Sequence, residues 1–151
     1  MEPHVTTRKL QSDDHSAALV LYDVLLGVKP ASPDPAAFNR VLQHPGTQVI
    51  GAFDHHHLRA FVTLHILPNV TLSGRPYALL ENVATHPDFR AQGFARAAMN
   101  HAIETAWTAD CYKIMLLTGR NSDAKGFYKK LGFDADQKCG MQLRRLPDRA
   151  P

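Results

Sequence analysis

The residues that say most about chemistry lie in residues 83–96, where an apolar strand leads into a turn and then a helix. The first N–H groups of a helix lack partners within it, and the positive end of the helix dipole lies behind them. Gly93 opens this helix and lets an anion approach the backbone closely, as does the small Ala95. Arg90 and Arg96 add positive charge. The segment therefore predicts a phosphate-binding turn.

A second informative string, NSDAKGFYKKLGF, occupies residues 121–133. Together the two strings resemble the Gcn5-related N-acetyltransferase (GNAT) superfamily. The coenzyme A motif of that family runs Arg/Gln-x-x-Gly-x-Gly/Ala, which residues 90–95 match. A downstream pattern, Asn-x-x-Ala-x-x-Phe-Tyr-x-x-x-Gly-Phe, matches residues 121–133. Upstream, Val83, Pro87 and Arg90 also have the family spacing.

The resemblance implies an α/β (α+β) fold of the GNAT acyl-CoA N-acyltransferase type. We expect a central mixed, mostly antiparallel twisted sheet of six to seven strands, flanked by about four helices, in a single domain over residues 1–151. The resemblance also implies acetyl-CoA as cosubstrate, no metal, and a primary amine of a small molecule or protein as acceptor. Many relatives dimerise, so a homodimer is compatible with it.

The resemblance further assigns roles around the coenzyme. Val83 and Thr85 would lie on the strand that pairs with the pantetheine arm, where a neighbouring N–H would polarise the acetyl carbonyl. Residues 92–96 would donate N–H groups to the pyrophosphate, and Asn121 would contact the coenzyme A arm. The expected coenzyme-binding residues are Val83, Ala84, Thr85, Arg90, Ala91, Gln92, Gly93, Phe94, Ala95, Arg96, Asn121 and Tyr128.

Tyr128 stands where the family keeps its general acid, which protonates the departing thiolate. A phenol with a reference pKa of ~10 carries its proton at neutral pH. A positioned proton donor typically contributes ~100- to 10,000-fold to the rate. The alternative is that Tyr128 only covers the core beside Phe127.

The general base is less well defined. An alkylamine with a pKa of ~10.4 is protonated at pH 7, so a proton must leave before attack on the thioester. Glu81 is the first candidate, because it lies in an apolar strand, where a purely solvated carboxylate is not expected. A salt bridge is the alternative role for Glu81, and His65 and His86 are weaker candidates for the base. Some relatives carry a Glu on the following strand, but residues 115–117 here are Met-Leu-Leu.

The elements that must position these groups follow from hydrophobic periodicity and turn residues. Ser12 is the expected N-cap of a first helix that Gly27 closes, and Asp34-Pro35 begins a second helix. We expect an antiparallel meander followed by a strand–helix–strand crossover that pairs in parallel. The predicted strands are residues 5–10, 47–53, 58–67, 77–85, 113–118 and 139–146, and the later helices are residues 93–110 and 122–131.

Composition narrows the class of protein. The 151 residues carry a formal net charge of +3, with no basic run interleaved with aromatic residues, so nucleic acid is not expected as a partner. No stretch approaches the length of a membrane span. Cys111 and Cys139 form neither a disulfide framework nor a zinc signature, which favours a cytoplasmic protein. The run of histidines at residues 55–57 is interpreted as a hairpin turn and not as a metal site.

Two other functions stay open on the same fold. One is a non-catalytic acyl-CoA-binding regulatory module, because a fold does not determine a function. The other is an enzyme that uses a longer acyl-CoA. No cysteine is placed for a covalent acetyl relay, so direct transfer in a ternary complex is the expected route.

Overall fold

The structure is a computed structural model that describes residues 4–27 and 34–146. The chain divides into two compact units, Met1–Leu116 and Leu117–Pro151, and each is described by itself. The expectation of one acetyltransferase domain over residues 1–151 stays a prediction beside this division.

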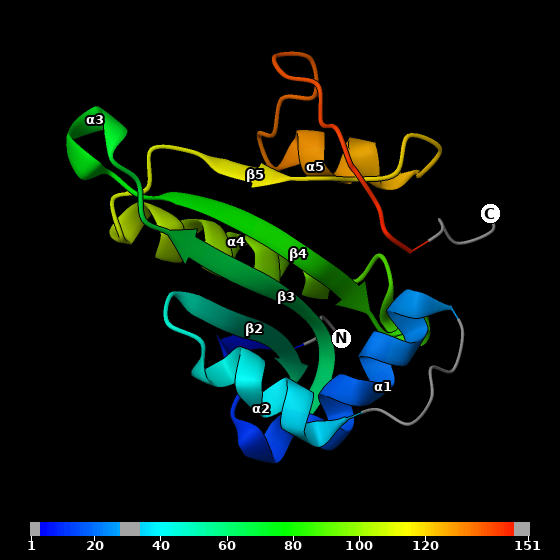
Figure 1. Cartoon of the computed structure of the whole chain (residues 1–151). Helices are drawn as coiled ribbons and strands as arrows, with labels where there is room; N and C mark the ends of the chain where they lie inside the picture. Colours follow the sequence, from blue (N-terminus) through cyan, green and yellow to red (C-terminus); the bar gives the residue numbers. More distant parts are fainter. Residues whose placement is uncertain (1–3, 28–33, 147–151) are drawn as a thin grey trace. The chain divides into compact units, whose positions relative to one another are not determined.

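A five-stranded sheet in the order β1-β2-β3-β4-β5 forms the centre of the first unit (Figure 1). Neighbouring strands from β1 to β4 are antiparallel, and β5 pairs with β4 in parallel. The expected mixed, mostly antiparallel sheet is therefore confirmed. The strands are β1 (Val5–Lys9), β2 (Thr47–Asp54), β3 (His57–Leu67), β4 (Tyr77–Thr85) and β5 (Ile114–Leu116).

The expected count of six to seven strands is wrong for the described residues, which form five. Residues 139–146, predicted as the last strand, have no regular structure. Their apolar side chains find no surface to cover, since Met141 is 90% and Leu143 is 103% exposed. A strand is stable only with a paired neighbour and a buried face, and the alternation of apolar residues alone supplies neither.

Two of the predicted helix-boundary signals are confirmed, and one is wrong. Asp34 caps α2 (Pro35–Gln43) by accepting a hydrogen bond from the N–H of Ala36 at 2.9 Å. Gly27 ends α1 (His15–Leu26) in the left-handed region with φ of 68°. Ser12, however, is not the N-cap of α1, because it begins a short 3₁₀ turn, η1 (Ser12–Asp14), that precedes the helix.

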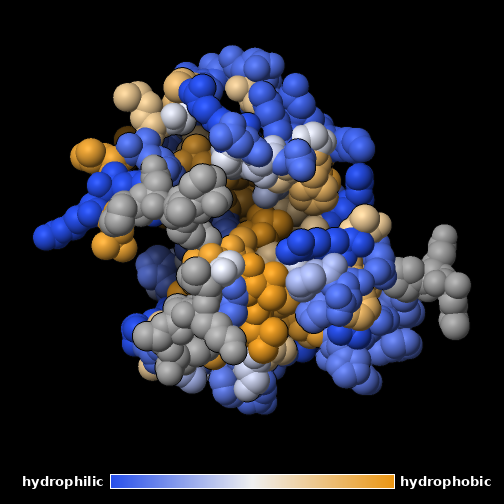
Figure 2. All heavy atoms as spheres, turned by 90° about the vertical axis from the view of Figure 1, so that its right-hand side faces the viewer, coloured by the Kyte–Doolittle hydropathy of each residue, from blue (hydrophilic) through white to orange (hydrophobic). Residues whose placement is uncertain are grey.

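Helices cover both faces of the sheet (Figure 1). On one face, α1 packs against β3 and β4 and α2 packs against β2, and on the other α4 (Phe94–Thr108) packs against β2, β3 and β4. Hydrophobic residues fill these layers, whereas hydrophilic residues cover most of the surface in Figure 2. The core cluster under α1 and α2 consists of Leu10, Ala18, Leu21, Phe38, Val49, Phe53, Leu58, Phe61 and Ala84.

Short segments complete the described chain. The turn η2 (Pro87–Phe89) joins β4 to α4, and α3 (Thr71–Gly74) is a single tight turn after β3. The second unit contains one helix, α5 (Ala124–Lys130), among its described residues. None of the described helices is both long enough and apolar enough to cross a membrane.

Candidate active site

The outer edge of β4 changes partner halfway along the strand. Pairing with β5 stops at Leu80, which lies opposite Leu116. Beyond that point β4 continues to Thr85 and pairs, among the described strands, only with β3. Residues 81–85 therefore present main-chain groups on an edge of the sheet, which is a surface that an extended, amide-containing ligand can pair with.

A β-bulge interrupts β4 at the same point. Thr63 of β3 pairs with Glu81 and Phe61 pairs with Ala84, so β4 holds one residue more than β3 between these pairs. Asn82 lies in the left-handed region with φ of 53°. A bulge bends the strand and reorients its main-chain groups. The bulge was not predicted from the sequence, in which the tolerance of asparagine for positive φ is its only signal.

The turn before α4 has the backbone expected of an anion site. Ala91 has φ of 59° and Gly93 has φ of 90°, both in the left-handed region. A Cβ atom at Gly93 would meet no other atom within 4 Å. Glycine is thus required here by its dihedral angle, and open space lies in front of the backbone where an anion would bind.

The main-chain donors of this turn are free to bind a ligand. The first helical hydrogen bond of α4 runs from the N–H of Ala97 to the Gly93 oxygen at 2.9 Å. No side chain caps the helix, and the N–H groups of residues 91–96 have no acceptor within the described ranges. The side-chain amide of Gln92 donates from Nε2 to the Asp88 carbonyl at 3.0 Å, which stabilises the turn and leaves the main-chain N–H of Gln92 available.

Aromatic contacts anchor the turn to the core. Phe94 is 1% exposed, and its ring meets that of Phe89 edge-on at 6.0 Å between centroids. The guanidinium of Arg59 lies over the ring of Phe89, 3.7 Å from its centroid. The helix therefore begins at a rigid point, which preorganises its donors.

Positive charge is available around these donors. Arg90 and Arg96 are both exposed, and neither forms an ion pair with a described residue. Val83 and Thr85 are half-buried and Ala84 is 3% exposed, so these three strand residues mainly offer their main chain. The predicted coenzyme residues from 83 to 96 thus lie on one continuous strand–turn–helix unit.

Glu81 is exposed, so the expectation that an apolar strand would shield it from solvent is wrong. The physical reason is its position, since it lies just past the last pair with β5 and next to the bulge. Within the described part of the chain Glu81 forms no ion pair, so the alternative salt bridge is not found. Its cross-strand neighbour Thr63 is 1% exposed, and the Thr63 hydroxyl lies beside the phenol of Tyr22, outside ideal hydrogen-bonding geometry.

The two histidines considered as weaker bases have different surroundings. The Nδ1 atom of His86 lies 3.3 Å from the Asp88 N–H, which donates to it and so makes it a cap for η2. The Nδ1 atom of His65 lies 2.8 Å from the hydroxyl of Thr47. His65 shares the face of Thr63 and Glu81, because it lies two residues from Thr63 along β3.

Tyr128 and Asn121 belong to the second unit. The Tyr128 ring packs against Phe127 at 5.2 Å and Phe133 at 6.2 Å between centroids. Burial raises the pKa of the Tyr128 phenol, so the proton is held more firmly than on a free tyrosine. Asn121 is exposed just before α5. The placement of both residues beside the turn stays a prediction of the motif.

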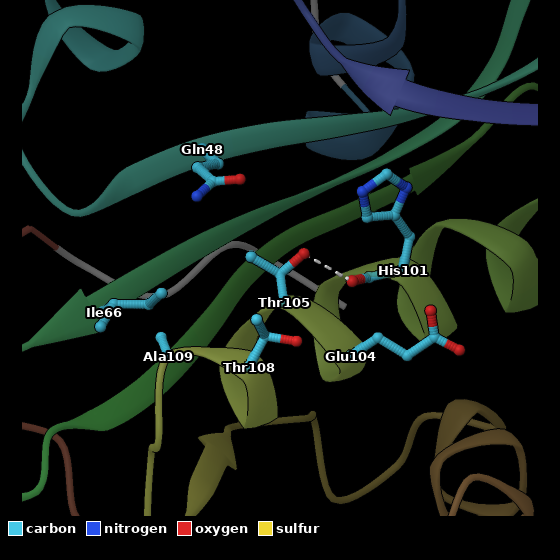
Figure 3. A pocket seen from close by; sticks show the side chains of 7 residues that line it. All are labelled: Gln48, Ile66, His101, Glu104, Thr105, Thr108 and Ala109. Carbon is cyan, nitrogen blue, oxygen red and sulfur yellow. Dashed lines mark hydrogen bonds between the residues drawn. The ribbon is translucent and has the colours of Figure 1, made fainter.

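A cavity of about 440 Å³ lies elsewhere in the first unit, at the C-terminal half of α4 (Figure 3). None of the predicted site residues lines it. The C-terminal end of a helix carries a partial negative charge, which disfavours phosphate. This cavity is therefore not the expected coenzyme site. Its lining residues are Gln48, Ile66, His101, Glu104, Thr105, Thr108 and Ala109.

The described residues hold no group of three or more His, Cys, Asp or Glu side chains that could bind a metal ion. His55 and His56 form the connection between β2 and β3, and His57 is the first residue of β3, where it pairs with Asp54. The predicted hairpin turn is confirmed for residues 55 and 56, whereas His57 belongs to the strand.

Comparisons with known proteins agree with this geometry. The chain is 29% identical over 134 residues to a glucosamine 6-phosphate N-acetyltransferase of Trypanosoma brucei brucei, covering 87% of this chain and 90% of the relative. A solved candidate acetyltransferase of Agrobacterium tumefaciens str. C58 is 40% identical with a TM-score of 0.88, covering 93% of this chain and 99% of that one. An acetyltransferase structure from Trypanosoma brucei is 26% identical with a TM-score of 0.80, at the same coverage.

The family model of the acetyltransferase (GNAT) family matches residues 8–133. This range contains strands β2 to β5, the glycine turn before α4 and the helix that carries Tyr128. The expected family and the acetyltransferase class are thus confirmed. The chain belongs to the acetyltransferase (GNAT) family.

Proposed function

We propose that this protein binds acetyl-CoA at the strand–turn–helix unit of residues 83–96 and transfers the acetyl group directly to a primary amine. The observation that carries the proposal is the turn itself. Two left-handed residues, Ala91 and Gly93, precede a helix with uncapped N–H groups, and beside it lie two arginines that form no ion pair with residues 4–27 or 34–146. A diphosphate offers the oxygens and negative charge that such a site binds best.

The exposed edge of β4 supports the position of the remaining coenzyme. A pantetheine arm contains two amides, which can pair with the free main-chain groups beyond Leu80. The bulge at Asn82 reorients N–H groups close to the end of that arm. One of them would donate to the acetyl oxygen and stabilise the charge that forms there during attack. Val83, Ala84 and Thr85 supply this edge, and the family motif assigns Asn121 to the coenzyme A arm.

The reaction converts a protonated amine and the thioester into an amide, a thiol and one released proton. Glu81 accepts a proton from the acceptor nitrogen, directly or through water, so that the nitrogen lone pair can form the new C–N bond. The C–S bond then breaks, and Tyr128 donates its proton to the departing sulfur. The second proton that the nitrogen loses as the amide forms returns to the Tyr128 phenolate, so only the proton on Glu81 is released. The raised pKa of Tyr128 keeps the phenol protonated until that step.

Direct transfer fits the cysteines better than a covalent intermediate. Cys111 is 3% exposed, and burial together with Asp110 raises the pKa of its thiol. A buried thiol with a raised pKa is a poor nucleophile, because the thiolate is the reactive form.

The acceptor is proposed to be a small-molecule amine. The curated relative is named for a phosphorylated amino sugar, and the exposed Glu81 suits an ammonium group of such a compound. A protein amine as acceptor, a homodimer and a cytoplasmic location stay predictions. The alternative function is a regulatory module that binds acyl-CoA without transfer, and a longer acyl chain is a further option.

An amine panel tests the proposal. Purified protein with acetyl-CoA is assayed for free thiol release in the presence of glucosamine 6-phosphate, simple diamines and a peptide with a free N-terminus. We expect release that depends on both enzyme and amine, with the acetylated amine detected by mass spectrometry. Coenzyme binding without thiol release from any amine would instead favour the regulatory module.

A further inference from the structure

A chain of two imidazoles and one hydroxyl lies on the same face of the sheet as Glu81. The Thr47 hydroxyl is 2.8 Å from Nδ1 of His65 and 3.0 Å from Nδ1 of His44. Thr47 is 7% exposed, His65 is half-buried and His44 is exposed. The three side chains thus lead from a partly covered position on the sheet, through a buried hydroxyl, to solvent.

The pairing register of the strands places these three hydrogen-bonded side chains next to Glu81, the candidate base. Thr47 pairs with His65 and His65 pairs with Leu79, while Thr63 pairs with Glu81 in the adjacent row. His65 and Glu81 are therefore diagonal neighbours on one face. Diagonal positions in an antiparallel pair lie roughly 7–8 Å apart, a distance that one water molecule or a bound amine can bridge.

We propose that His65, Thr47 and His44 form a proton relay that carries the proton removed from the acceptor amine to solvent. This inference rests on the proposed function, because it presumes an amine beside Glu81. His65 accepts a proton at Nε2 and gives up the one at Nδ1 to Thr47. The Thr47 hydroxyl passes its own proton to Nδ1 of His44, and His44 releases a proton from Nε2 to water.

The number of protons on the three groups allows the order that the relay needs, with His65 as donor to Thr47 and His44 as acceptor from it. A hydroxyl has one proton to donate, so it cannot donate to both imidazoles at once. At least one of the two histidines must therefore donate from Nδ1, and the other can accept. A chain with one donor and one acceptor end passes a proton by shifting every bond in the same direction. Imidazole suits this task, since it exchanges protons near neutral pH and has two nitrogens.

The turn that carries His44 is held rigidly over Thr47. Gly46 has φ of 77°, and a Cβ atom there would lie 2.5 Å from the carbonyl oxygen of Ile66. The N–H of Ile66 donates to the Gly46 oxygen at 2.7 Å, and the N–H of Thr47 donates to the His44 oxygen at 3.1 Å. The contact between His44 and Thr47 is therefore fixed by backbone bonds and does not depend on a mobile side chain alone.

Few other charged groups lie on the elements that pack over this face. Arg40 is the charged residue of α2, and it pairs with Asp34 at 3.4 Å. On α1, Tyr22 has a pKa raised mainly by burial, so it stays protonated and neutral. Asp23 and His15 are the remaining titratable groups of that helix. Glu81 is thus the carboxylate on the strands of this face that can exchange protons with His65.

The test removes the hydroxyl of Thr47 while keeping the shape of the side chain. Thr47→Val removes the link between the histidines, Thr47→Ser restores it, and Thr7→Val is the matched control. Thr7 makes the same kind of bond, with 2.9 Å between its hydroxyl and Nδ1 of His101, but it lies on β1, outside the relay. Coenzyme A should raise the melting temperature of all four proteins equally, which shows that the coenzyme site is intact.

The pH dependence of kcat/KM separates a relay from a structural contact. We expect Thr47→Val to lower kcat/KM roughly tenfold at pH 7, less than the ~100-fold or more typical of losing a general base, because water can replace the relay. The loss should shrink as the pH approaches the pKa of the amine, and added imidazole should reverse it. A loss that is equal at every pH, or no loss, would overturn the relay.

Imidazole nitrogen NMR gives a readout that does not depend on activity. The wild-type protein should show a proton on Nδ1 of one of the two histidines, and Thr47→Val should abolish that state. Two histidines that both carry their proton on Nε2 would contradict the relay even in an active enzyme. Wild-type protein that releases no thiol with any amine would contradict the proposed function itself, which is a different result.

Discussion

The hydroxyl of Tyr128 and the carboxylate of Glu81 are the two groups to which the proposed chemistry assigns proton transfer. Their surroundings differ as the two roles require. Tyr128 is packed against two aromatic rings, and its pKa is raised by burial. Glu81 is exposed at the free edge of β4. A donor that keeps its proton and an acceptor that meets substrate from solvent are the arrangement that amide formation at neutral pH needs.

We expect Tyr128→Phe to lower kcat by roughly 100-fold or more, because the departing thiolate loses its proton donor. The ring and its packing remain, so coenzyme A should raise the melting temperature as in the wild type. Steady-state assays of thiol release measure the effect. Unchanged turnover would show that Tyr128 only covers the core beside Phe127.

Glu81→Gln should lower turnover more than it weakens coenzyme binding, with the largest loss at low pH, where the amine is most protonated. Glu104→Gln is the control, since Glu104 is an exposed glutamate on α4 and not part of the proposed machinery. Measured kcat values for both variants decide the assignment. Equal activity of wild type and Glu81→Gln would leave His65 as the candidate base.

At the scale of elements, the site depends on where β4 ends its pairing and how α4 begins. A strand with a free edge, a bulge and a glycine turn follow one another over residues 81–93. Each feature alone is common in proteins. Because they follow one another along the chain, they place main-chain donors at both ends of an extended ligand.

Gly93→Glu should abolish the effect of coenzyme A on the melting temperature, because it adds negative charge and a strained side chain at the turn. Gly27→Glu is the matched control, since Gly27 also has positive φ and open space around it but lies at the end of α1. Thermal unfolding with and without coenzyme A measures both variants. Wild-type behaviour of Gly93→Glu would exclude this turn as the phosphate site.

The junction between β1 and α1 gives a prediction for acid stability. Arg8 binds both carboxylate oxygens of Asp14, at 2.7 and 2.8 Å, and this hydrogen bonding lowers the pKa of Asp14. The pKa of Asp14 is therefore lower in the folded protein than its value of ~3.9 in the unfolded chain. The pair with Arg8 stabilises the folded state fully above this unfolded-state pKa, and the stabilisation is lost as the pH falls through the pKa of the folded state.

Asp14→Asn should therefore lower the free energy of unfolding at pH 7 by roughly 0.5–1 kcal/mol, a modest value because Arg8 is half exposed and solvent screens the pair. The difference from wild type should narrow below about pH 4, where the unfolded carboxyl binds its proton. Asp13→Asn, at an exposed neighbour, is the control. Chemical denaturation across this pH range provides the comparison, and a gap that stays constant with pH would contradict the assignment.

At the scale of the whole molecule, ligand binding and folding are linked. A ligand that binds only the folded state stabilises it by about 2.7 kcal/mol at 100 times its dissociation constant. We expect coenzyme A at millimolar concentration to raise the melting temperature, with dephospho-coenzyme A and inorganic phosphate as comparisons. No shift with coenzyme A would count against both the enzyme and the regulatory module.

Much of the fold could be predicted from local patterns. Period-two alternation located β3, and the cap at Asp34 and the glycine at position 27 located helix ends, because these signals act within a few residues of the chain. The strand predicted at residues 139–146 failed for the opposite reason. Met141 and Leu143 alternate correctly but remain exposed, since pairing depends on a distant partner.

The sequence by itself determined the family motifs, the glycine turn and the identities of Tyr128 and Glu81, because these depend on residue type and short spacing. Tertiary structure alone decided that β5 leaves β4 at Leu80, that Asn82 forms a bulge, and that Thr47 joins His44 to His65. Those features arise from pairing between segments that are far apart in the chain. The secondary-structure propensity of individual residues does not determine which edge of a strand stays unpaired or which side chains share a face across strands.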